Sequence, residues 1–206
     1  MKFYLSSYKI GRETKRLRRM LPRNRRTAYI ANSCDCYKDT KRTEEGDRFN
    51  FRQLRSVGLN PERLDLRDYF GRRAELERKL KGFGAIWVRG GNTFVLRQAM
   101  RLSGFDTIFK KLAKRKDVLY GGYSAGICIL SPSLHGLELV DDKTQRPYGK
   151  RSRLIWEGLG AVDYAFAPHY RSRHPESRLA GRTVRYYIDH KIPFIALRDG
   201  EVIIIE

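Results

Sequence analysis

A serine at position 124 stands between two glycines in the stretch "DVLYGGYSAGICIL", residues 117–130. Gly122, Ser124 and Gly126 fit the Gly-x-Ser-x-Gly pattern of a nucleophile elbow, in which a strained strand-to-helix turn lifts the serine hydroxyl above a sheet. The apolar residues on both sides suit such a strand and such a helix. The same pattern also fits a tight glycine turn with a capping serine, so this stretch alone leaves both interpretations open.

A nucleophilic serine needs a general base, and the chain has four histidines. His169 lies at the end of the apolar stretch 161–170, "AVDYAFAPHY", which predicts a strand. The end of that strand would reach the same edge of the sheet as Ser124, so we predict His169 as the base. The other three histidines have ordinary explanations. We expect His135 to be exposed, His174 to precede a helix-starting proline, and His190 to lie at a helix end, where a cation is favourable.

The base in turn needs a carboxylate that orients it. The chain order serine, acid, histidine is one that α/β hydrolytic folds allow, and Glu138, Asp141 and Asp142 lie between Ser124 and His169. A neighbouring acidic pair is more often a solvated loop tip, because two close carboxylates repel each other.

A second glycine site, "WVRGGNTF", ends another apolar run. Gly90 and Gly91 would let the backbone approach a ligand closely, and an N–H there could join that of Ala125 in an oxyanion hole. A plain strand-to-helix turn is the alternative. The segment lacks the spacing of a dinucleotide loop and the Gly-Lys-Ser/Thr of a P-loop, which disfavours nucleotide binding.

Strands alternate with helices along the chain, which predicts one α/β domain over residues 1–206 with a mostly parallel sheet and helices on both faces. In that architecture ligands bind at the carboxyl ends of the strands. The least regular segment, 136–153, predicts a surface loop. The expected strands are 2–7, 27–33, 63–66, 85–91, 118–122, 161–170 and a hairpin over 193–206, and the expected helices are 48–58, 73–84, 92–104, 105–115, 125–131 and 175–190.

Composition narrows the function classes. The content of 41% hydrophobic residues predicts a globular protein, and we expect no membrane helix and no signal segment. Cys34, Cys36 and Cys128 form neither a disulfide framework nor a metal-ligand spacing, so we expect no metal, no cofactor and a reducing cytoplasm. The net charge is +20, and basic residues are most frequent at 15–26 and 109–116. Such a surface would attract polyanions, but no nucleic-acid-binding motif favours specific recognition.

Three motifs in order, "IWVRGGNTFVLRQAM", "GGYSAGICILSPSLHGLELVDD" and "APHYRSRHPES", resemble peptidase family S51, the dipeptidase E (aspartyl dipeptidase) group. The resemblance extends over nearly the whole chain. It implies a class I glutamine-amidotransferase-like, flavodoxin-like three-layer α/β fold with serine in place of the amidotransferase cysteine. It also implies metal-free hydrolysis of dipeptides with an N-terminal aspartate. We expect a small peptide substrate as the partner, no membrane and no specific nucleic acid, and a monomer or homodimer.

Carried over residue by residue, the resemblance makes Ser124 the nucleophile and His169 the base, with Gly91 and Ala125 at the oxyanion-hole positions. His169 would take the Ser124 proton as the hydroxyl attacks the scissile carbonyl.

For the acid, the resemblance favours Glu138, with Asp141 as the alternative, because relatives commonly carry an acid near this position and the spacing varies. An N-terminal aspartate also needs a cation for its side chain and an acceptor for its ammonium. Asn92, Tyr123 and Arg171 are the candidate substrate-binding residues.

One departure from the family pattern is Arg89, which stands where a third glycine is usual. Its side chain either points away from the turn or changes the entrance and adds an anion contact. Two further functions remain open: an S51-like hydrolase of another acidic or polymeric peptide, as in cyanophycinase, and an inactive relative that binds polyanions through its basic surface. The length and the "PHYRSRHP" motif favour the dipeptidase branch.

Overall fold

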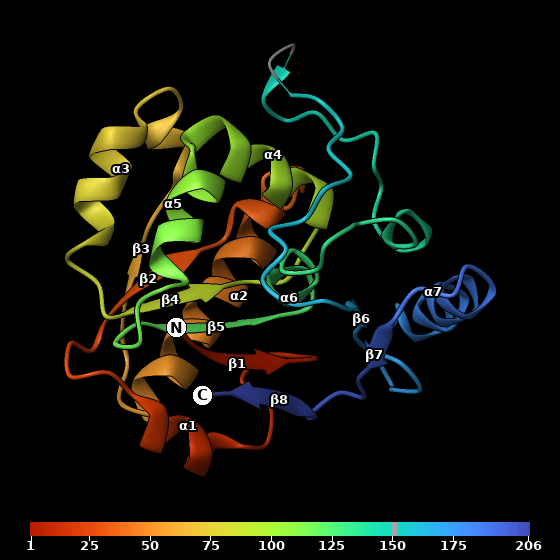
Figure 1. The fold of residues 1–206 in the computed structure, drawn as a ribbon, viewed down its shortest axis with the longest axis horizontal. Helices are drawn as coiled ribbons and strands as arrows, with labels where there is room; N and C mark the ends of the chain where they lie inside the picture. Colours follow the sequence, from red (N-terminus) through yellow and green to blue (C-terminus); the bar gives the residue numbers. More distant parts are fainter. Residues whose placement is uncertain (150–151) are drawn as a thin grey trace.

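The computed structural model describes residues 1–149 and 152–206 and is built on a six-stranded sheet (Figure 1). The strand order is β3-β2-β4-β5-β1-β8, in which all neighbouring pairs are parallel except β1 and β8. The predicted α/β fold with a mostly parallel sheet is therefore confirmed. The strands of this sheet are β1 (Lys2–Ser6), β2 (Arg26–Ile30), β3 (Asn60–Arg63), β4 (Ala85–Val88), β5 (Leu119–Tyr123) and β8 (Val202–Ile205).

Helices cover both faces of this sheet, and each face has its own apolar cluster. One cluster joins the sheet to α3, α4, α5 and α6, and the other joins it to α1 and α2. Because apolar strands alternate with helices along the chain, the helices bury both faces of the sheet and form a three-layer arrangement. The helices are α1 (Thr14–Met20), α2 (Thr40–Ser56), α3 (Arg73–Leu80), α4 (Thr93–Ser103), α5 (Phe105–Leu112), α6 (Ala125–Cys128) and α7 (Ser177–Asp189), with short 3₁₀ turns at η1 (Asn32–Cys34), η2 (Leu66–Tyr69) and η3 (Leu137–Leu139).

A second sheet of two parallel strands, β6 (Ala165–Ala167) and β7 (Phe194–Ala196), lies beside the carboxyl ends of β1 and β5 (Figure 1). Helix α7 packs on it through Val184 and Tyr187. The predicted hairpin over 193–206 is wrong, because β7 pairs with β6 whereas β8 pairs with β1. The residues between β7 and β8 therefore cross from one sheet to the other.

The structure also differs from the predicted helices at α1, α2 and α6. Helix α1 was not expected, because its run of basic residues shows little apolar periodicity. Helix α2 begins eight residues before the expected start at 48, because Asp39 caps its amino end by accepting from Arg42 N–H. Helix α6 is only four residues long. Among the described residues, no helix is both long and apolar enough to cross a membrane.

Candidate active site

Ser124 occupies a strained turn between β5 and α6, with φ 52° and ψ −119°. Such a backbone conformation is unfavourable for residues other than glycine and is often found at functional sites. The flanking glycines are required by close packing, since a Cβ at Gly122 would lie 2.8 Å from the carbonyl oxygen of Val88, and one at Gly126 would collide with the same atom. The turn thus has the backbone form of the nucleophile elbow.

His169 shares a narrow cavity with Ser124. It is buried, with 2% of its surface exposed, and its backbone also has a positive φ, 62°. Its N–H donates to Ser7 Oγ at 2.9 Å, which fixes the residue against the end of β1. The cavity is lined by Thr93, Ser124, Ala125, Cys128, Leu137, Val140, Asp141, Ala167, Pro168, His169, Glu176, Ala180 and Thr183.

The carboxylate beside His169 is Asp199, whose Oδ1 lies 2.7 Å from His169 Nδ1. Ser7 Oγ lies 3.1 Å from the same carboxylate oxygen as a donor, and the Asp199 N–H donates to Ser172 Oγ at 2.8 Å. Asp199 is therefore held in place from two sides. An acid in this position can fix the imidazole tautomer and stabilise the imidazolium.

Neither acid favoured from the sequence reaches the His169 ring, which corrects their expected placement. Glu138 lies in η3 and accepts a hydrogen bond from Gly136 N–H at 2.6 Å. Asp141 lines the cavity, but it accepts from Thr93 N–H at 2.8 Å. The expected chain order of serine, acid and histidine excluded Asp199, although an acid shortly after a predicted strand was a usable signal.

The Gly90-Gly91 turn packs directly on the elbow. A Cβ at Gly90 would lie 2.9 Å from the Cβ of Ser124, and Gly91 has φ 151° beside the backbone of Ser33. Ser33 Oγ donates to the carbonyl oxygens of Arg89 and Gly90, at 3.0 Å each, and thereby holds the turn.

The two expected oxyanion donors remain available to a ligand. Within the described parts of the chain, the N–H groups of Gly91 and Ala125 donate no hydrogen bond to another protein group. Because Gly90 touches Ser124 and Ala125 follows it, both turns lie at the nucleophile. This arrangement suits the stabilisation of a developing oxyanion.

A second histidine stacks on His169. The His169 and His174 rings are 3.7 Å apart at an interplanar angle of 12°, and the edge of Tyr8 contacts both rings. Glu176 Oε2 lies 3.9 Å from His169 Nε2 and 3.9 Å from His174 Nδ1. The expectation from the sequence did not include His174 or Glu176 in the site.

His169, His174 and Glu176 bring three possible metal-ligand atoms within 4.8 Å of one another. The rings, however, are stacked, so their nitrogen lone pairs lie in two nearly parallel planes and do not converge on one point. His174 Nδ1 also accepts from Glu176 N–H at 3.2 Å, and His169 Nδ1 faces Asp199. This donor set does not fit a tetrahedral ion unless a ring turns.

The carboxylic acids in the cavity lining are Asp141 and Glu176. Burial of its carboxyl group raises the pKa of Asp141 to about 6, although part of the residue reaches the surface. Burial, together with the charges of Asp141 and Asp199, raises the pKa of Glu176 to about 7. Burial lowers the pKa of His169, against the opposing effect of Asp199, and burial and His169 lower the pKa of His174 to about 4. No lysine or arginine is among the described residues that line the cavity.

The three residues expected to bind substrate lie outside this lining. Asn92 caps α4, since its Oδ1 accepts from Val95 N–H while its Nδ2 donates to the Asp142 carbonyl. The Tyr123 hydroxyl accepts from Asn50 Nδ2 at 3.1 Å. Arg171 is exposed, with its guanidinium 5.2 Å from the centre of the Tyr170 ring. Their role in binding substrate stays a prediction.

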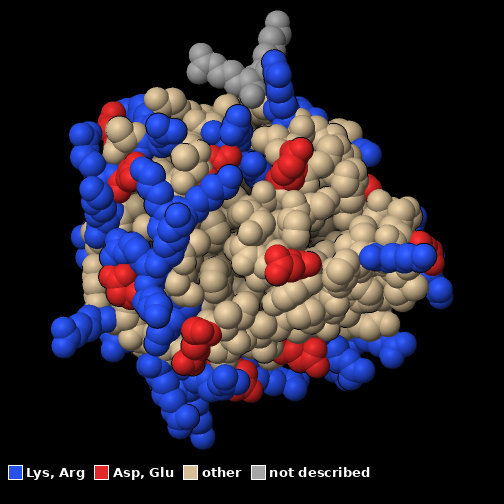
Figure 2. Space-filling model, viewed as in Figure 1, with Lys and Arg blue, Asp and Glu red and all other residues tan. Residues whose placement is uncertain are grey.

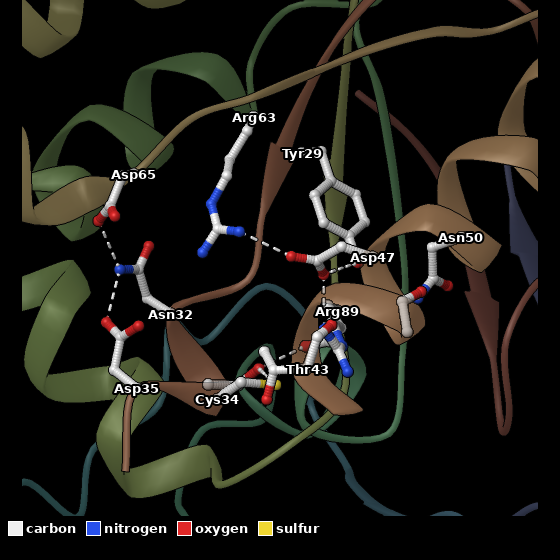
Figure 3. A network of polar contacts seen from close by, with 12 residues as sticks. Tyr29, Asn32, Cys34, Asp35, Thr43, Asp47, Asn50, Arg63, Asp65 and Arg89 are labelled. Carbon is white, nitrogen blue, oxygen red and sulfur yellow. Dashed lines mark hydrogen bonds and ion pairs between the residues drawn. The ribbon is translucent and has the colours of Figure 1, made fainter. Parts of the chain in front are cut away.

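Arg89 points neither outward nor into the cavity but toward α2 (Figure 3). Its guanidinium pairs with the Asp47 carboxylate and donates to the Thr43 carbonyl at 2.8 Å. Arg63 donates to the other Asp47 oxygen, at 2.8 Å. A Cβ at Gly46 would collide with the Arg89 guanidinium, so a glycine on α2 makes room for this side chain.

Basic side chains are unevenly distributed over the surface. On the face that Figure 2 draws, lysine and arginine side chains are densest at the left and lower edges, where Figure 1 places α3, α5 and α1, and others lie at the right near α7.

Comparisons with known proteins show what this chain is similar to. The family model described as "Peptidase family S51" matches residues 13–206. An uncharacterized peptidase of Listeria monocytogenes is 35% identical over 119 residues, which cover 57% of this chain and 54% of that protein. A probable alpha-aspartyl dipeptidase of Drosophila melanogaster is 31% identical over 130 residues, which cover 60% and 50%. The matched regions thus span about half the length of these curated relatives.

Solved structures extend the likeness to the whole fold. The crystal structure of a putative peptidase E protein from Listeria monocytogenes superposes with a TM-score of 0.75 at 25% identity and covers 99% of this chain and 93% of that one. A peptidase from an acI-B1 actinobacterium superposes with a TM-score of 0.71 over 100% of this chain and 83% of that one, at 14% identity.

Proposed function

This chain belongs to peptidase family S51, and from that membership we propose that it is a serine-type dipeptidase that cleaves peptides with an N-terminal aspartate. The observation that carries the proposal is the strained Ser124 turn, which shares a cavity with a His169 ring held by Asp199. A strained nucleophile, a buried base and an orienting acid are the parts that acyl transfer needs.

In the proposed reaction, His169 Nε2 takes the proton of Ser124 Oγ as this oxygen attacks the scissile carbonyl carbon. Asp199 keeps the remaining ring proton on Nδ1 and stabilises the imidazolium. The N–H groups of Gly91 and Ala125 stabilise the oxyanion. His169 then protonates the leaving amine, and water hydrolyses the acyl-enzyme in a second round of the same steps.

The acids in the cavity support a substrate with a free amino terminus. Asp141 and Glu176 line the same cavity as Ser124, and no described lysine or arginine there neutralises them. A protonated α-amino group would supply the missing positive charge and would be held beside the nucleophile. This arrangement would make Ser124 attack the first peptide bond of a substrate.

An N-terminal aspartate would bring a second carboxylate near these acids. Because like charges repel, this carboxylate would have to point away from Asp141 and Glu176, whose ionised forms hold the ammonium. The Drosophila relative's description as a probable alpha-aspartyl dipeptidase supports this choice of substrate.

The experiment is a panel of Asp-Xaa and other dipeptides assayed with the wild type and with Ser124→Ala. We expect hydrolysis of at least one Asp-Xaa dipeptide by the wild type only, together with labelling of Ser124 by a fluorophosphonate probe. Equal turnover by the variant would exclude the serine mechanism. Labelling with turnover only of other acidic or polymeric peptides would favour the broader hydrolase.

The net charge of +20 favours a second candidate function, an inactive relative that binds polyanions. An absence of both fluorophosphonate labelling and turnover, combined with salt-sensitive binding to a polyanion such as heparin, would support that function instead.

A further inference from the structure

Lys9 lies on the turn that follows β1, at the carboxyl edge of the sheet where the catalytic residues also lie. Its backbone has φ 53°, in a region that favours glycine. In the described chain, five residues other than glycine have a positive φ, and two of the other four are Ser124 and His169. Backbone strain of this kind tends to gather at functional sites, which makes Lys9 a candidate for a function.

The ammonium of Lys9 is held by aromatic rings without a carboxylate. Its Nζ lies 4.1 Å from the centre of the Phe49 ring on α2 and 4.8 Å from the centre of the Tyr8 ring. Within the described residues no acidic group forms a salt bridge with it. Arg89 and Arg97, in contrast, are both paired with aspartates. Lys9 is thus a half-buried cation that can still bind an anion.

Only one aromatic ring separates this cation from the catalytic base. The Tyr8 ring meets the His169 ring edge-on at 5.7 Å and the Tyr123 ring at 6.1 Å, and Tyr123 precedes Ser124. Neither Tyr8 nor Lys9 lines the acidic cavity. Acidic side chains therefore line the cavity beside Ser124, and a cation lies outside it, on the other side of the Tyr8 ring.

We propose that Lys9 binds the C-terminal carboxylate of the substrate and thereby restricts the enzyme to dipeptides. This inference rests on the proposed function. In a dipeptide, one residue of roughly 3.5 Å separates the scissile bond from the terminal carboxylate, so the carboxylate lies near the nucleophile. The flexible four-carbon stem of lysine can bring its ammonium to such an anion. A longer peptide would place an uncharged amide there.

The zwitterionic form of a dipeptide matches this distribution of charge. Its ammonium would lie with Asp141 and Glu176 in the cavity. Its carboxylate would be directed toward Lys9, past the Tyr8 ring beside His169. Charge complementarity at both ends would also orient the scissile bond.

Binding measurements with Ser124→Ala, which is not expected to consume its ligand, test this inference. The probes are Asp-Ala and Ala-Ala, each compared with its C-terminal amide by calorimetric titration. We expect each free acid to bind on the order of tenfold more tightly than its amide. Adding Lys9→Met should bring the ratio close to one, and Lys9→Arg should preserve most of it. The matched control is Lys15→Met on exposed α1, which removes the same charge and should leave the ratio unchanged.

The inference would be overturned if Ser124→Ala bound the free acids and their amides with equal affinity. It would also be overturned if adding Lys9→Met left the affinity ratio and the melting temperature unchanged. Lower thermal stability of Lys9→Met with a preserved ratio would make Lys9 a packing residue only, which also overturns it. If the wild type hydrolyses no dipeptide but the ratio is lost specifically in Lys9→Met, the carboxylate site stands and the proposed function fails.

Discussion

Asp199 Oδ1 lies 2.7 Å from Nδ1 of His169 although the two residues are separated by 30 positions in the sequence. The pairing of β6 with β7 explains this contact, because Ala167 and Ala196 are partners in a parallel ladder. The chains that leave the two strands therefore emerge side by side, with the base two residues beyond one strand and the acid three residues beyond the other.

Asp199→Asn should reduce kcat by roughly three to four orders of magnitude, because an amide can hold the wrong imidazole tautomer and does not stabilise the imidazolium. Glu138→Gln removes an acid that contacts only its own turn, so it should leave kcat within a few-fold. Steady-state kinetics of the two variants on one dipeptide would check this. A larger loss in Glu138→Gln would return the role to the residue that the sequence favoured.

Replacing each of the four histidines with alanine should reduce kcat by different amounts. His169→Ala should lose about two to four orders of magnitude in kcat, as expected for a lost general base. His174→Ala should lose less, through a poorly held His169 ring, because the two rings stack at 3.7 Å. His135→Ala and His190→Ala should stay near wild type. If His174→Ala abolished turnover while His169→Ala retained it, the base assignment would be wrong.

The role of Ser124 could be predicted from the sequence, whereas the contact of Asp199 with His169 could not. The elbow is local: its glycines and serine lie within five residues, and their steric requirements are visible in the sequence. The contact of Asp199 with His169 depends instead on which strand pairs with β7. The Asp-Gly turn followed by an apolar run predicted a hairpin, but the exposed edge of β1 pairs with β8 and β6 pairs with β7. Long-range pairing of this kind is not encoded in turn residues.

Arg89 shows the same limit at a single position. The sequence marks it as a departure from a glycine, but its partner Asp47 lies 42 residues earlier. Only the packing of α2 on this face of the sheet brings them together, and Gly46 explains why the larger side chain fits.

The acidic pair predicts opposite effects of pH on binding and on stability. Substrate ammonium binds the ionised carboxylates, so KM for a dipeptide should rise as the pH falls through about 7 and then about 6, the raised pKa values of Glu176 and Asp141. The native state holds protons that the unfolded state releases near pH 4 to 4.5. The free energy of unfolding should therefore fall as the pH rises from there to about 7.

Glu176→Gln should accordingly raise KM and, at pH 8, raise the melting temperature relative to wild type. Thermal melts and KM measured between pH 5 and 8 would check both effects. A variant that melts below the wild type at pH 8 would contradict the assignment of Glu176 as a carboxyl group destabilised by ionisation.

Helix α2 is joined to both catalytic turns by two residues one helical turn apart. Asp47 pairs with Arg89, which precedes the Gly90-Gly91 turn, and Asn50 donates to Tyr123, which precedes Ser124. Both α2 residues are buried. Changes at this helix should therefore displace the oxyanion donors or the nucleophile without touching the substrate.

Asp47→Asn tests this connection, and the chain offers a matched control in Asp106→Asn. Asp106 forms a comparably buried pair with Arg97, and each of the two changes turns the carboxylate of a buried arginine pair into an amide. Loss of a buried partner typically destabilises a protein by about 3–5 kcal/mol, so both variants should unfold at lower denaturant concentration. Only Asp47→Asn should also reduce kcat, by roughly tenfold or more, at nearly constant KM, because small displacements of catalytic groups slow the chemical step. Equal kcat in the two folded variants would show that the Asp47–Arg89 pair contributes to stability alone.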